Sequence, residues 1–225
     1  LPPDAGPARL DAYLAAWSVI SHLSQFGRQD WNARERTFAY LNRGGLEFTD
    51  VSLASGLGVP DDGRSLAVGD LDRDGRLDLV FRNRTAPILR VFQGVDPGGS
   101  SVSFRLSQAG PNADGIGALV SIERGGVSRS ARILAGDGFL GSSPPEAFFG
   151  LAAPSSPPLT TATVRWPDGE VERFERSGGG SLGSASWLLV RGTAVARRRH
   201  GHGAPTPALD VAVAPVLRGG EAPPA

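Results

Sequence analysis

One stretch decides the fold: Asp70-Leu71-Asp72-Arg73-Asp74-Gly75-Arg76-Leu77-Asp78, which places four carboxylates at alternate or near-alternate positions around one glycine. Calcium takes about six to eight oxygen ligands, and aspartates at this spacing can converge on one point, while the glycine accepts the positive φ of a sharp turn. The stretch predicts a calcium loop that binds through the side chains of Asp70, Asp72, Asp74 and Asp78 and a backbone carbonyl near Arg76. The alternative is a solvated turn that binds nothing, because Asp and Gly are ordinary turn residues.

The residues on either side of this loop favour β-strands. Residues 65–69 precede it, and residues 77–81 follow with alternating apolar side chains at Leu77, Leu79 and Phe81. A helix-flanked EF-hand has a bidentate Glu at the twelfth loop position, where this chain has Phe81. The loop is therefore predicted to join two strands.

Composition excludes several classes of function. Acidic and basic residues balance at 23 each, and every basic residue is Arg, so no net field favours nucleic acid or an anionic membrane. The absence of cysteine excludes disulfides, zinc-thiolate sites and cysteine nucleophiles. No apolar run approaches the roughly 20 residues that span a bilayer.

Calcium also bears on location. Calcium loops of weak or moderate affinity fill reliably where calcium is abundant, which is outside the cytosol, so we expect a secreted or periplasmic protein. The chain begins with Leu1 and shows no signal peptide, which suggests a processed chain or a fragment.

The first part of the chain predicts one helix and one sheet module. Apolar residues recur at helical spacing over residues 8–26, and this stripe is expected to face a core. Residues 37–41 and 46–51 predict a hairpin around a turn at residues 42–45. With the calcium hairpin and a strand over residues 87–92, they are expected to form about one blade-sized sheet.

The second part predicts seven short strands separated by turn signals, which favour a β-sandwich or a barrel-like sheet. The strands are expected at residues 102–106, 118–122, 130–134, 147–151, 161–166, 171–174 and 187–190. Beyond Gly192 the periodicity is lost, and the Pro-, Gly- and Ala-rich tail is predicted to be mostly disordered. The fold class is therefore all-β with one N-terminal helix, and the expected divisions are 1–30, 31–97, 98–192 and 193–225.

Short motifs in both parts resemble one known arrangement. Residues 69–80 resemble the FG-GAP/VCBS repeat, the calcium-loop blade of integrin-like β-propellers. Four later motifs look like the successive signatures of the ASPIC/UnbV domain, which follows FG-GAP repeats in the cartilage acidic protein family and its bacterial relatives: Asn112 with Gly115-Ile116-Gly117-Ala118, Gly136-Asp137-Gly138-Phe139-Leu140, Phe148-Phe149-Gly150-Leu151 and Val164-Arg165-Trp166-Pro167-Asp168-Gly169. The resemblance implies a propeller-blade-like module followed by a β-sandwich-like ASPIC/UnbV domain.

The chain departs from that family in two respects. Phe148 and Ala152 stand where the family usually has a His and a Gly. The chain also has one Asp-rich loop, and one blade cannot close a propeller without exposing sheet edges. We therefore expect either the C-terminal part of a longer protein or a reduced version whose N-terminal helix covers an edge.

Few residues are suited to catalysis. His22 lies in the predicted helix and His200 and His202 in the tail, and the chain has no Lys, so Ser-His dyads and Schiff bases have no members in the β-regions. The carboxylates of Asp114, Asp137 and Glu146 remain as candidates for acid-base chemistry. The first two also fit ordinary Asp-Gly turns.

The resemblance thus implies a calcium-binding β-protein outside the cytoplasm that is not an enzyme and serves as a binding or adhesion-type module, with calcium in a structural role. A protein or glycan is the expected partner, and nucleic acid is not. Two alternatives stay open. One is a carboxylate-based polysaccharide hydrolase or lyase with structural calcium, and the other is a purely structural terminal domain of a larger assembly.

Overall fold

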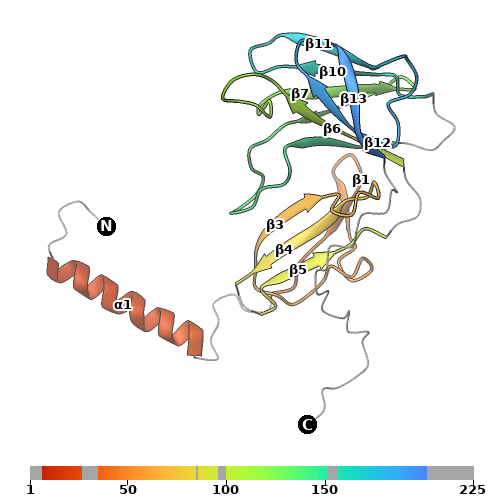
Figure 1. Ribbon diagram of the computed structural model, residues 1–225. Coiled ribbons are helices and arrows are strands. Elements are labelled where there is room, and N and C mark those ends of the chain that lie inside the picture. Colours follow the sequence, from red (N-terminus) through yellow and green to blue (C-terminus); the bar gives the residue numbers. More distant parts are fainter. Residues whose placement is uncertain (1–6, 27–34, 85, 96–99, 152–156, 202–225) are drawn as a thin grey trace. The chain divides into compact units, whose positions relative to one another are not determined.

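The computed structural model describes residues 7–26, 35–84, 86–95, 100–151 and 157–201, with side chains of the first helix described for residues 11–22. The fold is mostly β, with one helix near the N-terminus, as predicted (Figure 1). The chain divides into two compact units, residues 1–64 with 83–88 and residues 65–82 with 89–225. Each unit is described by itself.

The first unit begins with α1 (Pro7–Phe26), at the place where the apolar spacing predicts a helix. The helix ends before Gly27, a residue type that favours helix termination. Its large apolar side chains Tyr13, Leu14 and Trp17 are exposed, so the expectation that this stripe faces a core does not hold among the described residues. No helix in the described part of the chain has the length and apolar character that a membrane span requires.

The predicted hairpin is present as β1 (Tyr40–Gly44) and β2 (Glu47–Asp50), an antiparallel pair. Its turn lies two residues beyond the expected centre, because Gly44 and Gly45 both adopt positive φ, of 107° and 61°. The expected single sheet over residues 37–92 is wrong, since β1 and β2 form a two-stranded sheet of their own. The following loop hydrogen-bonds back towards the hairpin, with the Thr37 amide donating to the Val59 carbonyl at 3.0 Å.

The strands that flank the Asp-rich loop are confirmed. They form a three-stranded sheet in the order β3 (Gly63–Gly69), β4 (Asp78–Asn83), β5 (Leu89–Phe92). β4 and β5 are antiparallel, and the rings of Phe81 and Phe92 meet edge to face at 5.3 Å. This sheet is the platform that carries the candidate metal site.

The remaining strands form one sheet of eight strands in the order β8-β7-β10-β11-β13-β12-β6-β9. Of the two arrangements predicted for this region, the structure shows the barrel-like sheet and not a two-layer sandwich, because all eight strands belong to one nearly closed sheet (Figure 1). The pairs β6–β12 and β11–β13 are parallel, and the others are antiparallel. The bounds are β6 (Ser100–Ser107), β7 (Leu119–Arg124), β8 (Val127–Arg132), β9 (Glu146–Leu151), β10 (Thr161–Arg165), β11 (Val171–Arg176), β12 (Ala185–Val190) and β13 (Val195–Gly201).

Seven of these eight strands lie where the sequence predicts them, and β13 does not. The prediction of a disordered tail from residue 193 is wrong for residues 195–201, because they pair with β12 on one side and with β11 on the other. Ala196 is the one fully buried residue of β13, and Arg197, Arg198 and Arg199 are exposed, so the strand shows no apolar alternation. Residues 202–225, including His202, lie outside the described residues.

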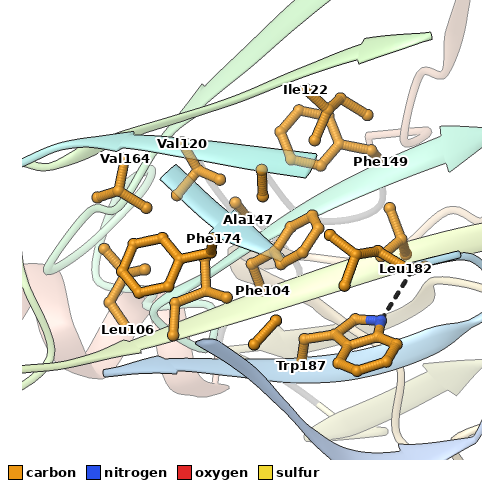
Figure 2. Close-up of a cluster of buried hydrophobic side chains, with 14 of the residues drawn as sticks. Phe104, Leu106, Val120, Ile122, Ala147, Phe149, Val164, Phe174, Leu182 and Trp187 are labelled. Carbon is orange, nitrogen blue, oxygen red and sulfur yellow. Dashed lines mark hydrogen bonds between the residues drawn. The ribbon is translucent and has the colours of Figure 1, made fainter. Parts of the chain in front are cut away.

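The barrel is filled by inward-facing side chains from most of its strands, which meet in one apolar cluster (Figure 2). Phe104 lies in the cluster and meets Phe149 edge to face, with ring centroids 6.1 Å apart. Trp187 is buried among them, and its indole Nε1 donates to the Leu182 carbonyl at 2.8 Å, which satisfies its polar atom.

β8 and β9 are the two edge strands of this sheet. No backbone pairing joins them among the described residues. Instead the Arg129 guanidinium on β8 donates from Nη1 to the Gly150 carbonyl on β9 at 2.7 Å. The two edge strands are thus joined by a charged side chain and not by the backbone hydrogen bonds that would close the barrel.

Candidate metal centre

The Asp-rich loop connects the end of β3 to the start of β4. It brings three carboxylates together, those of Asp70, Asp72 and Asp78, with one oxygen of each within 4.8 Å of the others. Asp70 and Asp72 are half-buried and Asp78 is buried. Three negative charges therefore converge on one small volume at the end of the sheet.

The loop holds its shape mainly through its own carboxylates. Asp72 Oδ1 accepts from the Asp74 amide at 3.1 Å, Asp74 Oδ1 from the Arg76 amide at 2.8 Å, and Asp70 Oδ2 from the Gly75 amide at 3.0 Å. Gly75 has φ of 87°, the left-handed conformation that the sequence predicts for it. Arg73 also has a positive φ, of 63°, so two of the loop residues carry the tight reversal.

Asp78 anchors the loop from inside. It is 2% exposed, and each of its oxygens accepts a backbone hydrogen bond, Oδ2 from Leu71 at 2.8 Å and Oδ1 from Gly94 at 2.9 Å. A carboxylate that accepts backbone N–H groups in a buried site is strongly bound. Asp78 thus ties the loop to the segment that follows β5.

Asp74 lies outside the group of three carboxylates. Its Oδ2 forms an ion pair with the Arg76 guanidinium, whose Nε donates to the Gly94 carbonyl at 2.8 Å. The side chain of Arg76 therefore neutralises the fourth aspartate of the loop. The full predicted ligand set of Asp70, Asp72, Asp74, Arg76 and Asp78 stays a prediction.

The three converging carboxylates fit a hard divalent cation. Carboxylate oxygens are the ligands that calcium prefers, and each carboxylate oxygen has lone pairs for both a hydrogen bond and a metal. Three like charges at this separation repel one another, and a divalent cation between them removes that repulsion. Asp70, Asp72 and Asp78 are the residues that would hold it, with calcium supplying structural charge neutralisation.

Three residues beyond the loop, which its aspartate spacing does not indicate, also belong to the centre. The Gln93 side chain donates from Nε2 to Asp72 Oδ2. Gly94 donates to Asp78, and a Cβ on Gly94 would lie 2.7 Å from the Leu77 carbonyl oxygen, so only glycine fits there. The Ser101 hydroxyl donates to the Gly75 carbonyl at 2.5 Å. The Gln-Gly pair after a predicted strand was the only available signal.

The carboxylates considered for acid-base chemistry have other partners. Glu146 is the first residue of β9, and its pKa is raised above the ordinary value. Burial is the largest cause of this rise; the charges of Arg199 and Arg105 oppose it, and the charge of Asp70 adds to it. Its Oε2 lies 3.9 Å from Arg199 Nη1. Asp114 is exposed in a turn.

A hollow of about 120 Å³ lies beside β8 and β9, and none of its lining residues is acidic. The lining residues are Ile122, Arg124, Gly125, Val127, Arg129, Gly150 and Leu151.

Asp137 closes the loop between β8 and β9. Its Oδ2 accepts from the Ser143 hydroxyl and its Oδ1 from the Ser143 amide, both at 2.8 Å. These bonds, the side-chain one first, hold the pKa of Asp137 below its ordinary value. Its geometry is that of a loop clamp.

A pH titration can check this role. The pKa of Asp137 is lower in the folded state than in the unfolded chain, so its stabilisation is present above about pH 4 and is lost as the pH falls through the folded-state pKa. The melting temperature of Asp137→Asn is expected to lie below that of wild type at pH 6 and to approach it near pH 2. Asp114→Asn is the matched Asp-Gly control, and a constant offset between Asp137→Asn and wild type at all pH values would contradict the role.

The motif over residues 164–169 lies beside a second charged cluster, formed by Asp168, Glu170 and Arg191. Trp166 is buried, as expected, and the Arg191 guanidinium lies over its ring at 5.2 Å. Arg191 also pairs with Asp168 and Glu170, and hydrogen bonding to its side chain lowers the pKa of Asp168. The contacts explain this motif as a structural corner of the barrel.

Two family models match separate parts of the chain. Residues 27–81 match the family model described as an FG-GAP-like repeat, and this match includes the Asp70 to Asp78 loop. Residues 108–183 match the model described as ASPIC and UnbV, and this match contains strands β7 to β11 of the barrel. No curated protein matches the sequence of the chain.

Proposed function

Because the chain joins an FG-GAP-like repeat to an ASPIC and UnbV domain, we propose that it is a calcium-binding β-protein that works outside the cytoplasm as a non-catalytic binding or adhesion-type module. Calcium has a structural role in this proposal. It neutralises the Asp-rich loop and fixes the surface that the neighbouring loops present.

The convergence of Asp70, Asp72 and Asp78 within 4.8 Å is the observation that carries the proposal. The surrounding contacts support it, because the backbone amides of Leu71 and Gly75 orient the carboxylates of Asp78 and Asp70. An aspartate loop of this kind is filled readily at millimolar calcium, which is typical of extracellular fluids. Location outside the cytoplasm follows from that chemistry as part of the proposal.

A non-catalytic role is supported by the partners of the remaining carboxylates. Asp137 is held by Ser143, and Glu146 lies beside Arg199. Neither arrangement pairs a proton donor with a second carboxylate across a substrate-sized cleft, which glycoside hydrolysis requires. The structure gives the hydrolase or lyase alternative no specific support. The proposed partner is a protein or a glycan.

Calcium titration of thermal stability tests the proposal. At a calcium concentration about 100 times the Kd, binding contributes about 2.7 kcal/mol, which raises the melting temperature by about 5–10 °C in a chain of this size. Asp72→Asn is expected to remove more than half of that rise, because it takes one charge from the cluster while leaving the side-chain shape intact. Differential scanning calorimetry with calcium and with EDTA measures both values.

The control is Asp114→Asn, an exposed aspartate in an Asp-Gly turn outside the cluster. It is expected to retain the full calcium-dependent rise. Equal melting of the wild type with calcium and with EDTA would sink the proposal, as would an equal loss in the two variants.

A further inference from the structure

The Asp-rich loop is attached to the barrel at two places within the same compact unit. One attachment comes from β6 and reaches the middle of the loop. The other comes from the loop between β8 and β9 and reaches β3 just before the first aspartate. Both attachments use serine hydroxyl groups.

The first attachment is the hydroxyl of Ser101 on β6. It donates to the Gly75 carbonyl at 2.5 Å, and Ser101 is 4% exposed, so this bond is shielded from water. Gly75 is also the residue whose amide donates to Asp70 Oδ2 and whose positive φ reverses the loop. Ser101 therefore holds the peptide that orients one of the three converging carboxylates.

The second attachment is the hydroxyl of Ser143. It accepts from the Val68 amide at 3.0 Å, two residues before Asp70, and donates to Asp137. The loop between β8 and β9 also packs closely against β3, because a Cβ on Gly141 would lie 2.6 Å from the Leu66 carbonyl oxygen. A Cβ on Gly69 would lie 3.3 Å from the Pro144 ring. The barrel thus fixes the strand that leads into the site.

Both attachments reduce the freedom of the aspartate loop before a cation arrives. A loop that is already ordered loses less conformational entropy on binding, so pre-organisation increases affinity. Linkage makes the effect reciprocal, because a cation that favours the ordered loop also favours the attachments that order it.

We propose that calcium binding by the Asp70, Asp72 and Asp78 cluster is coupled to the packing of this loop on the barrel, with Ser101 as the positioning residue that links them. This inference rests on the proposed calcium site. It adds that the barrel sets the calcium affinity, and that calcium in turn strengthens the junction between the three-stranded sheet and the barrel.

Isothermal titration with calcium chloride tests the coupling in three full-length proteins: wild type, Ser101→Ala and Ser103→Ala. Ser103 is the matched control, because it lies on the same strand, is also 4% exposed and loses the same hydroxyl. The expected result is about fivefold weaker calcium binding in Ser101→Ala, the usual size of one lost hydrogen bond, and unchanged binding in Ser103→Ala.

Amide hydrogen exchange is the second measurement. If Ser101 affected only its own hydrogen bond to Gly75, the exchange rate of the distant Val68 amide would not change. Calcium is expected to slow exchange of the Val68 amide in the wild type, and to slow it less in Ser101→Ala. If Ser101→Ala does not fold, Ser143→Ala removes the second attachment and is expected to weaken calcium binding similarly in the same titration.

The outcomes separate the two proposals. Calcium binding that is equal in wild type, Ser101→Ala and Ser143→Ala overturns the coupling and leaves the calcium site standing, and so does an equal loss in Ser101→Ala and Ser103→Ala. No heat of calcium binding by the wild type overturns the calcium site and the coupling with it. Weaker binding in Ser101→Ala alone, with the Val68 response, supports both.

Discussion

Replacing Phe104 by alanine is expected to lower the free energy of unfolding by about 3–5 kcal/mol, the cost of removing a large aromatic side chain from a packed core. Phe104 is 0% exposed and lies on β6, opposite Trp187 on one neighbouring strand and Ala147 on the other. Its ring also meets that of Phe149 edge to face (Figure 2). The surrounding backbone belongs to a hydrogen-bonded sheet, so we expect it to relax only partly into the cavity.

Urea denaturation followed by tryptophan fluorescence measures this loss. Phe139→Ala is the control, because Phe139 is 72% exposed and its replacement is expected to change stability by no more than about 0.5 kcal/mol. A loss below about 1 kcal/mol in Phe104→Ala would show that this side chain is not part of a close-packed core.

Replacing Asp78 by alanine is expected to cost about 3–5 kcal/mol even without metal. The change removes both acceptors of the Leu71 and Gly94 amides in a buried site, and hydrogen bonds to a charged group contribute about 1.5–3 kcal/mol each. Relief of repulsion from Asp70 and Asp72 offsets only part of this loss, because those two carboxylates are half-buried and better solvated.

The measurement is urea denaturation in EDTA, so that calcium contributes nothing. Asp72→Ala is the comparison within the same cluster, and it is expected to lose much less, because Asp72 is less buried and accepts its bonds from Asp74 and Gln93 near the surface. If the two variants lose the same stability in EDTA, Asp78 is not the internal anchor of the loop.

Strands with apolar alternation were predictable from the sequence, whereas β13, which lacks it, was not. β6 and β10 bury alternate apolar residues, and both lie within two residues of their expected bounds. β13 carries three consecutive arginines and one buried alanine, so its sequence resembles a solvated tail. Its strand conformation comes from pairing with β12 and β11, which a local pattern does not reveal.

The grouping of strands was predicted less well than their positions. The hairpin of β1 and β2 and the sheet of β3 to β5 were expected to form one module, because they follow one another in the sequence. Sequence order does not show that the intervening loop returns to the hairpin through the Thr37 to Val59 bond. A sandwich was not distinguishable from a barrel for the same reason, since strand periodicity carries no information on which edges meet.

The candidate site shows a similar division. The aspartate spacing predicted a loop in which the side chains of Asp70, Asp72, Asp74 and Asp78 converge. In the structure the carboxylates of Asp70, Asp72 and Asp78 lie together, and that of Asp74 lies outside the group. It did not predict that Asp74 pairs with Arg76, because alternating residues of opposite charge are equally compatible with separate solvation. Ser101 lies 26 residues from Gly75 in sequence, and such a contact exists only once the fold has formed.

The arginine that spans the two edges of the barrel has a consequence for solubility. Unpaired strand edges are templates on which another chain can add a strand, and proteins protect them with charged side chains. The Arg129 guanidinium donates a hydrogen bond to the Gly150 carbonyl on the free edge of β9, so that edge carries a positive charge. An incoming strand would have to displace that bond and bury the charge, so the seam of the barrel is protected against edge-to-edge aggregation.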